Sequence, residues 1–306
     1  MSVNDSPPLV CICIPTYNAE HTILETLQSI INQSYQNTDI HVVDNASTDN
    51  TLKIVAEFND VRIQTHLNDI NIGAEGNFTR CIDLAAGKYT AIYHADDVYE
   101  QNMVEKQVKF LEANADVGAV FTQAITINEQ GTRLGAIGQS PVGDKGVERF
   151  NFCDLFQSML LNHNFLVCPS AMVRTEIYTE QIKSWGSSMF KSSSDIDTWL
   201  RLASHKPIAV LHEQLMRYRI SGTQFSDKIR NRTERADFFL VMDYYLTKPE
   251  VHDFISKNDL RYYGWLLRHD QVVRAFNLFS KQSISESKNL LQGFFCWDTF
   301  YAAIHN

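Results

Sequence analysis

The sequence has little basic charge, no long apolar run and no metal-binding cysteine spacing. Lys and Arg number 27 against 36 Asp and Glu, for a net charge of −9. This balance argues against a nucleic-acid partner, which is normally bound through a basic face. No uninterrupted run of about 18 apolar residues occurs, so no segment is expected to span a bilayer. Residues 1–8 lack the basic start and apolar stretch of a signal peptide, and we expect a cytoplasmic protein.

The cysteines are scattered along the chain, at Cys11, Cys13, Cys81, Cys153, Cys168 and Cys296. Cys11 and Cys13 alternate with apolar residues in one predicted strand, so both side chains should lie on the same face as small buried hydrophobic groups. Reduced structural thiols are therefore expected rather than a disulfide framework.

The first half of the chain alternates predicted strands with predicted helices. Short apolar runs predict strands over 9–14, 40–43, 61–65 and 89–93. Apolar residues at helical spacing predict helices over 19–33, 52–58, 76–86 and 101–114. We place the start of the second helix at Ser47 or Thr48, and a C-terminal cap of the third at Gly87. This order predicts an α/β fold with a mostly parallel sheet flanked by helices.

The pattern changes after residue 115. Strands are expected over 119–128, 133–137, 172–173 and 208–211, with helices over 150–161 and 195–204. From residue 223 onward helical patterns rich in aromatic residues dominate, including 261–279 and 283–294. We predict a catalytic domain over 1–225, with halves at about 8–115 and 116–225, and a C-terminal helical region over 226–306.

Two adjacent carboxylates, Asp96 and Asp97, end the strand predicted at 89–93. Like charges side by side repel each other, and ligands bind at the C-terminal edge of an open α/β sheet. The pair suggests a divalent metal and a phosphorylated substrate, although a solvated turn capping the next helix would also explain it. Polar segments 14–20, 43–49 and 71–73 follow the other strands, and the parallel order would bring all of them to the same edge.

With these segments assembled, residues 8–222 resemble the GT-A glycosyltransferases of family 2. The resemblance rests on Pro-x-Tyr-Asn after the first strand, the 43–49 signature, Asn-x-Gly and an Asp-x-Asp-like motif. It implies a nucleoside diphosphate sugar donor, with Asp97 and Asp96 holding Mg²⁺ or Mn²⁺. The implied donor-binding residues are Pro15, Thr16, Tyr17, Asn18, Glu20, Asp44, Asn45, Asn71, Gly73, Asn77, Arg80, His94, Ala95 and Asp96.

Three positions depart from the family pattern. His94 stands where the Asp-x-Asp motif often begins with Asp, and its imidazole could hydrogen-bond a ligand or pack at the strand end. Asn45 replaces a frequent second Asp, which leaves the nucleobase open. Ser221 occupies a place where relatives frequently carry His near the start of a loop.

The segment 193–202 resembles the family helix that carries the general base, here Asp195. A carboxylate within hydrogen-bond reach of an acceptor hydroxyl can take its proton during attack. The alternative role for Asp195 is a helix N-cap. Lower-ranked acceptor or loop candidates are Trp185, Asp197 and Arg219; Arg219 could contact phosphate or form a surface ion pair.

These features predict an inverting, metal-dependent glycosyltransferase that acts on a glycan or lipid-linked glycan, in bacterial surface polysaccharide synthesis. The competing hypotheses are a nucleotidyltransferase and an inactive GT-A-fold binding or scaffold protein. The aromatic C-terminal region could pack on the catalytic domain, form a homodimer, or contact the inner face of the membrane peripherally. Its large apolar side chains include Phe238, Tyr245, Trp265, Phe294, Phe295, Trp297 and Phe300.

Overall fold

The computed structural model describes residues 6–141, 146–186, 189–190, 192–220, 233–280, 286–287 and 290. The chain forms two compact units. The first comprises Met1–Phe156, Asn164–Met189 and Ser194–Ile220, and the second comprises Gln157–His163, Phe190–Ser193 and Ser221–Asn306. Several predicted features lie outside the described residues: Ser221, Cys296, most of the helix predicted at 283–294 (286–287 and 290 are described, and are helical), and the aromatic residues Phe294, Phe295, Trp297 and Phe300.

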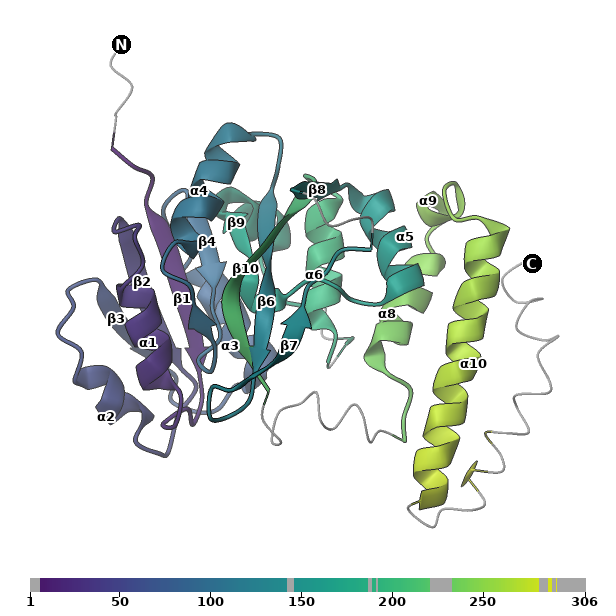
Figure 1. Cartoon of the computed structure of the whole chain (residues 1–306), viewed down its shortest axis with the longest axis horizontal. Helices are drawn as coiled ribbons and strands as arrows, with labels where there is room; N and C mark the ends of the chain where they lie inside the picture. The colour runs from purple at the N-terminus through teal and green to yellow at the C-terminus, as the bar shows by residue number, and fades with distance from the viewer. Residues whose placement is uncertain are drawn as a thin grey trace. The chain divides into compact units, whose positions relative to one another are not determined.

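A ten-stranded sheet organises the first unit, in the order β3-β2-β1-β4-β9-β6-β10-β5, with β7 paired to β6 and β8 paired to β10 (Figure 1). The strands are β1 Val10–Thr16, β2 Thr38–Asp44, β3 Ile63–Leu67, β4 Tyr89–Ile92, β5 Val98–Tyr99, β6 Ala119–Ile127, β7 Arg133–Ile137, β8 Val147–Phe150, β9 Met172–Arg174 and β10 Ile208–Arg219. Parallel pairings account for most of the paired residues.

Helices flank this sheet, so the predicted α/β fold is confirmed. They are α1 Ile23–Ile31, α2 Thr51–Ala56, α3 Gly73–Asp83, α4 Met103–Ala113 and α6 Ser194–Ala203. A further helix, α5 Phe152–Asn162, contains residues of both units. The first unit also has the short turns η1 Cys168–Ser170 and η2 Ile177–Ile182. The last of these is a π-helical turn.

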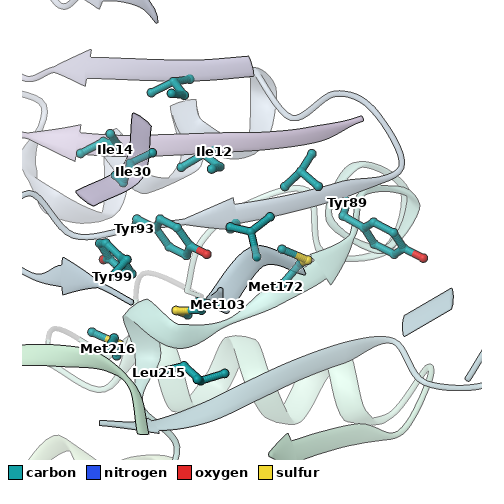
Figure 2. Packing of buried hydrophobic residues seen from close by; sticks show 14 of the residues in the cluster. Ile12, Ile14, Ile30, Tyr89, Tyr93, Tyr99, Met103, Met172, Leu215 and Met216 are labelled. Atoms are coloured by element: carbon teal, nitrogen blue, oxygen red, sulfur yellow. The ribbon is translucent and has the colours of Figure 1, made fainter. Parts of the chain in front are cut away.

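The two faces of β1 pack against different helices. Ile12 and Ile14 join Ile30 of α1 in the main apolar cluster (Figure 2). The thiols of Cys11 and Cys13 point to the other face, where the Cys13 Sγ lies 3.5 Å from the carbonyl oxygen of Cys81 in α3. Since successive side chains of a strand alternate between faces, α1 and α3 cover opposite sides of β1. Both thiols are fully buried and free, as expected.

Several local expectations were wrong. Helix α2 begins at Thr51, and neither Ser47 nor Thr48 caps it. The Ser47 hydroxyl instead accepts the Asn18 N–H, and the backbone N–H groups of Ser47 and Thr48 donate to the side chains of Asp44 and Asn18. Helix α3 ends at Asp83, before Gly87. Gly87 adopts φ +68°, and a Cβ there would lie 2.6 Å from the carbonyl oxygen of Leu9, so glycine is required by this close approach.

The second unit contains α8 Asp237–Leu246, α9 Pro249–His252 and α10 Lys257–Ser280. The Tyr263 hydroxyl joins α10 to α8 by donating to Asp243 Oδ1 at 2.7 Å. The exposed face of α10 carries Tyr262, Trp265, Val272, Phe276 and Phe279. No helix in the described ranges is both long enough and apolar enough to cross a membrane.

Candidate active site

The parallel strands β3, β2, β1 and β4 bring the four polar segments to one edge of the sheet. Main-chain hydrogen bonds extend the ladder past the strand ends: the Asn45 N–H donates to the Thr16 carbonyl at 2.8 Å, and the Asn68 N–H donates to the Asp44 carbonyl at 2.9 Å. The Tyr93 N–H donates to the Cys13 carbonyl at 2.8 Å. The loops that follow these strands are far apart in sequence but start at the same edge of the sheet, the C-terminal edge at which α/β sheets bind ligands.

The loop after β1 is tied to the loop after β2. Asn18, at φ +48°, donates its N–H to Ser47 Oγ at 2.9 Å and accepts the Thr48 N–H on Oδ1 at 2.8 Å. Glu20 Oε2 accepts the Asn50 N–H at 3.0 Å. Asn18 and Glu20 thus position the two loops. The Tyr17 ring is 49% exposed, so it is available for stacking against a ligand. Pro15 is the penultimate residue of β1, pairs with Val43 of β2 and is partly buried.

Asp44, at the end of β2, is 1% exposed. Its Oδ2 accepts the Ser47 N–H at 2.9 Å, whereas its Oδ1 is buried and has no hydrogen-bond partner in the described part of the chain. A buried, unpaired carboxylate oxygen is costly, which makes it a strong acceptor for a ligand N–H or O–H group.

Four asparagines form a hydrogen-bonded network next to Asp44 in the chain, with Asn45, Asn68 and Asn77 buried and Asn71 exposed. Asn45 Nδ2 donates to Asn71 Oδ1 at 2.9 Å, and Asn45 Oδ1 accepts from Asn68 Nδ2 at 3.0 Å. Asn68 Nδ2 also reaches Asn77 Oδ1 at 3.0 Å, and Asn77 Nδ2 donates to the Val43 carbonyl at 2.8 Å. The carboxamide at position 45 both donates and accepts here, which a carboxylate could not do.

The same network shapes the turn that starts α3. Asn71 Oδ1 accepts the Gly73 N–H at 2.8 Å, and Gly73 takes φ +78° with open space around its Cα. Arg80, two turns into the helix, donates to the Leu67 carbonyl at 2.8 Å. Asn68 was not among the predicted site residues, although it directly follows β3, the kind of position from which the neighbouring site residues were predicted.

The Asp96–Asp97 turn is held from two other elements. Thr26 in α1 donates its hydroxyl to the carbonyls of Ala95 and Asp97 at 3.0 and 2.8 Å. Arg219 at the end of β10 donates its N–H to Asp97 Oδ1 at 2.8 Å and its Nε to the Asp96 carbonyl at 2.8 Å. Thr26 was not among the predicted site residues, although a threonine on the otherwise apolar, buried face of α1 is a visible feature of the sequence.

The Arg219 guanidinium is 5% exposed and bonds to Glu25 Oε2 at 2.5 Å and to the carbonyls of Asn128 and Glu129 at 3.2 and 3.0 Å. The Arg219 guanidinium therefore donates hydrogen bonds to carboxylate and carbonyl oxygens of the protein itself. Arg217, its neighbour on the strand, forms an exposed ion pair with Glu100 at 2.9 Å.

Asp97 and His94 are the electrostatically unusual pair of the site. The Asp97 side chain is fully buried, and its Oδ2 has no hydrogen-bond partner within the described residues. Burial and the Asp96 carboxylate raise the pKa of Asp97 well above its usual range, against the opposing Arg219 N–H. Burial lowers the pKa of His94, against the opposing charge of the Asp96 carboxylate.

The residues present fit a divalent cation. Ligand atoms of His94, Asp96 and Asp97 all lie within 4.8 Å of one another. Carboxylate oxygens suit Mg²⁺ and Mn²⁺, and a cation would neutralise the charge that burial of Asp97 penalises. The unpartnered Oδ2 of Asp97 supports this assignment.

Asp195 lies in the first turn of α6 and is half-buried. Burial raises the pKa of its carboxyl to about 6, and the Asn164 amide, which donates to Oδ2 at 3.3 Å, opposes this rise together with the backbone N–H groups of residues 195 and 196. A carboxylate whose pKa lies near neutral pH is suited to accept a proton. Asn164 was not among the predicted site residues, and the structure identifies it as the side chain bonded to the predicted base.

The Asp195 carboxylate lies within electrostatic reach of some of the same residues as the Asp96–Asp97 pair. The charges of Asp97, Asp96 and Asp195 all raise the pKa of the Tyr218 hydroxyl on β10, and burial is the larger cause. Asp195 and Asp97 likewise both raise the pKa of the buried Cys168 thiol. The fold therefore brings the predicted base and the predicted metal ligands within electrostatic reach of common neighbours.

The other predicted residues of this half pack into the protein. Asp197 is 2% exposed and pairs with Arg201 Nε at 3.0 Å. Arg201 in turn donates to the Ser184 and Gly186 carbonyls at 3.0 and 3.2 Å, which anchors the loop that carries Trp185. Trp185 is 7% exposed and lies against the rings of Phe78 and Trp199, at centroid distances of 4.7 and 5.3 Å.

The fold and the acidic sheet edge define an α/β glycosyltransferase of the GT-A type. A family model described as glycosyl transferase family 2 matches residues 11–181. The chain belongs to this family and is a glycosyltransferase. Membership favours glycosyl transfer over the nucleotidyl transfer that the sequence left as an alternative.

Three curated glycosyltransferases are similar in sequence to this chain. An uncharacterized glycosyltransferase of Haemophilus influenzae is 31% identical over 247 residues, which cover 79% of this chain and 75% of the relative. The putative teichuronic acid biosynthesis glycosyltransferase TuaG of Bacillus subtilis is 27% identical, with 72% and 82% covered. The Escherichia coli enzyme WfgD, named a UDP-Glc:alpha-D-GlcNAc-diphosphoundecaprenol beta-1,3-glucosyltransferase, is 38% identical over 106 residues, or 35% of this chain and 42% of WfgD.

Two solved structures share the fold. TarS 1-349 of S. aureus in complex with UDP-GlcNAc has a TM-score of 0.63 at 16% identity, with 93% of this chain and 80% of TarS covered. The mannosyltransferase PcManGT of Pyrobaculum calidifontis, in complex with GDP-Man and Mn²⁺, has a TM-score of 0.58 at 17% identity, with 98% and 86% covered. At these identities the likeness concerns the fold.

Proposed function

We propose that this chain is an inverting, metal-assisted glycosyltransferase that moves a sugar from a nucleoside diphosphate sugar to an acceptor hydroxyl. The observation that carries the proposal is the half-buried Asp195 carboxyl, which accepts a hydrogen bond from Asn164, has a pKa of about 6 and lies within electrostatic reach of the same partly buried residues, Tyr218 and Cys168, as Asp97. It combines a poised proton acceptor with a carboxylate pair suited to a diphosphate-bound cation.

The donor binds at the edge formed by β3, β2, β1 and β4 in this proposal. Tyr17 stacks on the nucleobase, and the unpartnered Oδ1 of Asp44 accepts a hydrogen bond from the base or ribose. Asp96 contacts the ribose or the cation. Asn45 and Asn77 act through the asparagine network that holds Asp44 and the turn at Gly73, and not by direct contact.

Asp195 takes the proton of the acceptor hydroxyl as that oxygen attacks the anomeric carbon. The bond to the diphosphate breaks on the opposite face, so one displacement inverts the anomeric centre. When bound, Mg²⁺ or Mn²⁺ would be held by Asp97 with Asp96 and would offset the charge growing on the leaving diphosphate. Arg219 keeps the Asp96–Asp97 turn in place through its contacts with both residues.

The acceptor is a glycan or a lipid-linked glycan of a bacterial surface polysaccharide, in a reaction at the cytoplasmic side of the membrane. The names of TuaG and WfgD support this class of pathway. We further propose that residues 1–225 form the catalytic domain, and that the helical region 226–306 mediates a homodimer or a peripheral membrane contact. The exposed aromatic face of α10 supports such a role.

Donor binding can be tested directly. We expect one or a few sugars linked to UDP, GDP or dTDP to raise the melting temperature when MnCl₂ is present, and to be hydrolysed slowly without acceptor. A donor at 100-fold its Kd stabilises the protein by about 2.7 kcal/mol, which thermal melting resolves. Failure of every donor to stabilise or be hydrolysed, with or without metal, would support an inactive GT-A-fold protein instead.

The pH dependence of kcat/KM tests the base. Only the ionised carboxylate accepts a proton, so kcat/KM should rise with pH through about 6 and level off above it. The Asn164 amide stabilises that ionised form, and Asn164→Ala should therefore raise the Asp195 pKa and move the rising limb to higher pH.

Asn162→Ala is the matched control, because the exposed Asn162 amide bonds only to the Ser158 carbonyl of its own helix in the described structure. The rising limb of its profile of kcat/KM against pH should coincide with that of the wild type. A limb that Asn164→Ala leaves in place would exclude Asp195 as the titrating group.

A further inference from the structure

His94 adds an imidazole to the carboxylate pair at the end of β4. Its Nδ1 lies 3.9 Å from Asp97 Oδ2, which is too long for a hydrogen bond. Two ligands that each sit about 2.0–2.2 Å from one ion can lie up to roughly 4.4 Å apart. The separation therefore leaves room for a single cation between the ring nitrogen and the carboxylate oxygen, with an Asp96 oxygen inside the same 4.8 Å cluster.

Two buried atoms of this cluster have no partner in the described part of the chain: Oδ2 of Asp97 and Nε2 of His94. Buried polar atoms are nearly always satisfied, and an unpaired one is costly. A histidine that merely packed at the strand end would be expected to find a carbonyl or hydroxyl for its ring N–H. The ring nitrogen that faces the unpaired Asp97 Oδ2 is Nδ1 and not Nε2, so this geometry indicates a ligand-binding role for Nδ1.

The imidazole is also held in place before any ion arrives. The backbone N–H of His94 donates to the Tyr99 hydroxyl at 2.8 Å, which fixes the main chain at this position, and the ring packs edge-on against Phe78 at a centroid distance of 5.6 Å. Tyr99 is fixed by stacking on Tyr93 at 4.0 Å.

We propose that His94 is a direct ligand of the divalent cation and shifts the site's preference from Mg²⁺ towards a transition ion such as Mn²⁺. This inference rests on the metal-assisted function proposed above. Mg²⁺ favours all-oxygen surroundings, whereas imidazole nitrogen is a ligand of first-row transition metals. Two carboxylates with one imidazole therefore form a mixed set that discriminates against Mg²⁺.

Pulsed EPR of the full-length protein with MnCl₂, alone and with UDP or GDP, tests the ligand assignment. The wild type should show ¹⁴N coupling from a directly bound imidazole. His94→Asn should keep Mn²⁺ through the carboxylates and lose the coupling. His21→Asn is the matched control, because the His21 side chain is 91% exposed. It should retain the coupling, and thermal melting establishes that each variant is folded.

Calorimetric titration with MnCl₂ and MgCl₂ tests the selectivity. His94→Asp restores a carboxylate and should lower the ratio of Mn²⁺ to Mg²⁺ affinity by roughly 10-fold or more. Mn²⁺ bound without ¹⁴N coupling, or a ratio unchanged in His94→Asp, would overturn the role of His94 while leaving the metal-assisted function intact. No binding of Mn²⁺ to the wild type under any condition would overturn both.

Discussion

Asp195→Asn is expected to lower kcat by about 10²–10⁴-fold, the usual contribution of a general base, while donor affinity stays near that of the wild type. The asparagine keeps the size and the hydrogen-bonding position but cannot take a proton from the acceptor. Burial already disfavours the Asp195 charge, as its raised pKa indicates, so a neutral side chain should not destabilise α6. Transfer kinetics and donor titration measure the two parts separately.

The matched control is Asp154→Asn, which removes an exposed carboxylate from the first turn of α5. It shares the helix position of Asp195 and lacks its surroundings, so transfer should be unchanged. Full activity in Asp195→Asn would remove this residue as the base. Loss of donor binding together with transfer would instead assign it a role in the donor site.

Asp97→Asn should, unlike Asp195→Asn, impair donor binding as well as transfer. We expect metal-dependent donor binding to weaken and transfer to fall by roughly 10²–10³-fold, the scale seen when one group that stabilises developing charge is removed. The asparagine Oδ1 can still accept the Arg219 N–H, so the turn should persist. The substitution also removes a fully buried carboxyl whose charge is strongly disfavoured, and the melting temperature without metal should not fall.

Asp83→Asn, at the exposed end of α3, is the control for this variant and should leave both donor binding and transfer unchanged. Calorimetry with MnCl₂ and the best donor, compared with the same titration in EDTA, measures the metal-dependent part. Equal metal dependence in the wild type and Asp97→Asn would exclude Asp97 as a ligand.

The alternation of strands and helices in the first half could be predicted because each element is determined by its own residues. Most of β1, from Val10 to Ile14, is a continuous apolar run, and Ile23, Leu27 and Ile30 repeat at the helical period. Strand β5 could not be predicted, because two residues, Val98 and Tyr99, become a strand only by pairing with Met216 and Arg217 of β10. Strand β8 likewise exists through its pairing with residues 208–211.

By itself the sequence determined which polar residues follow each strand, and therefore that Asp44, Asn45 and the Asp96–Asp97 pair meet at one sheet edge. Chain order and parallel pairing are enough for that conclusion. Only the tertiary structure decided what each group does there. It buries Asp97 beside His94, engages Arg219 with the protein's own oxygens, and sets the pKa of Asp195 near 6. Burial and hydrogen-bond partners come from residues distant in sequence, so no local pattern encodes them.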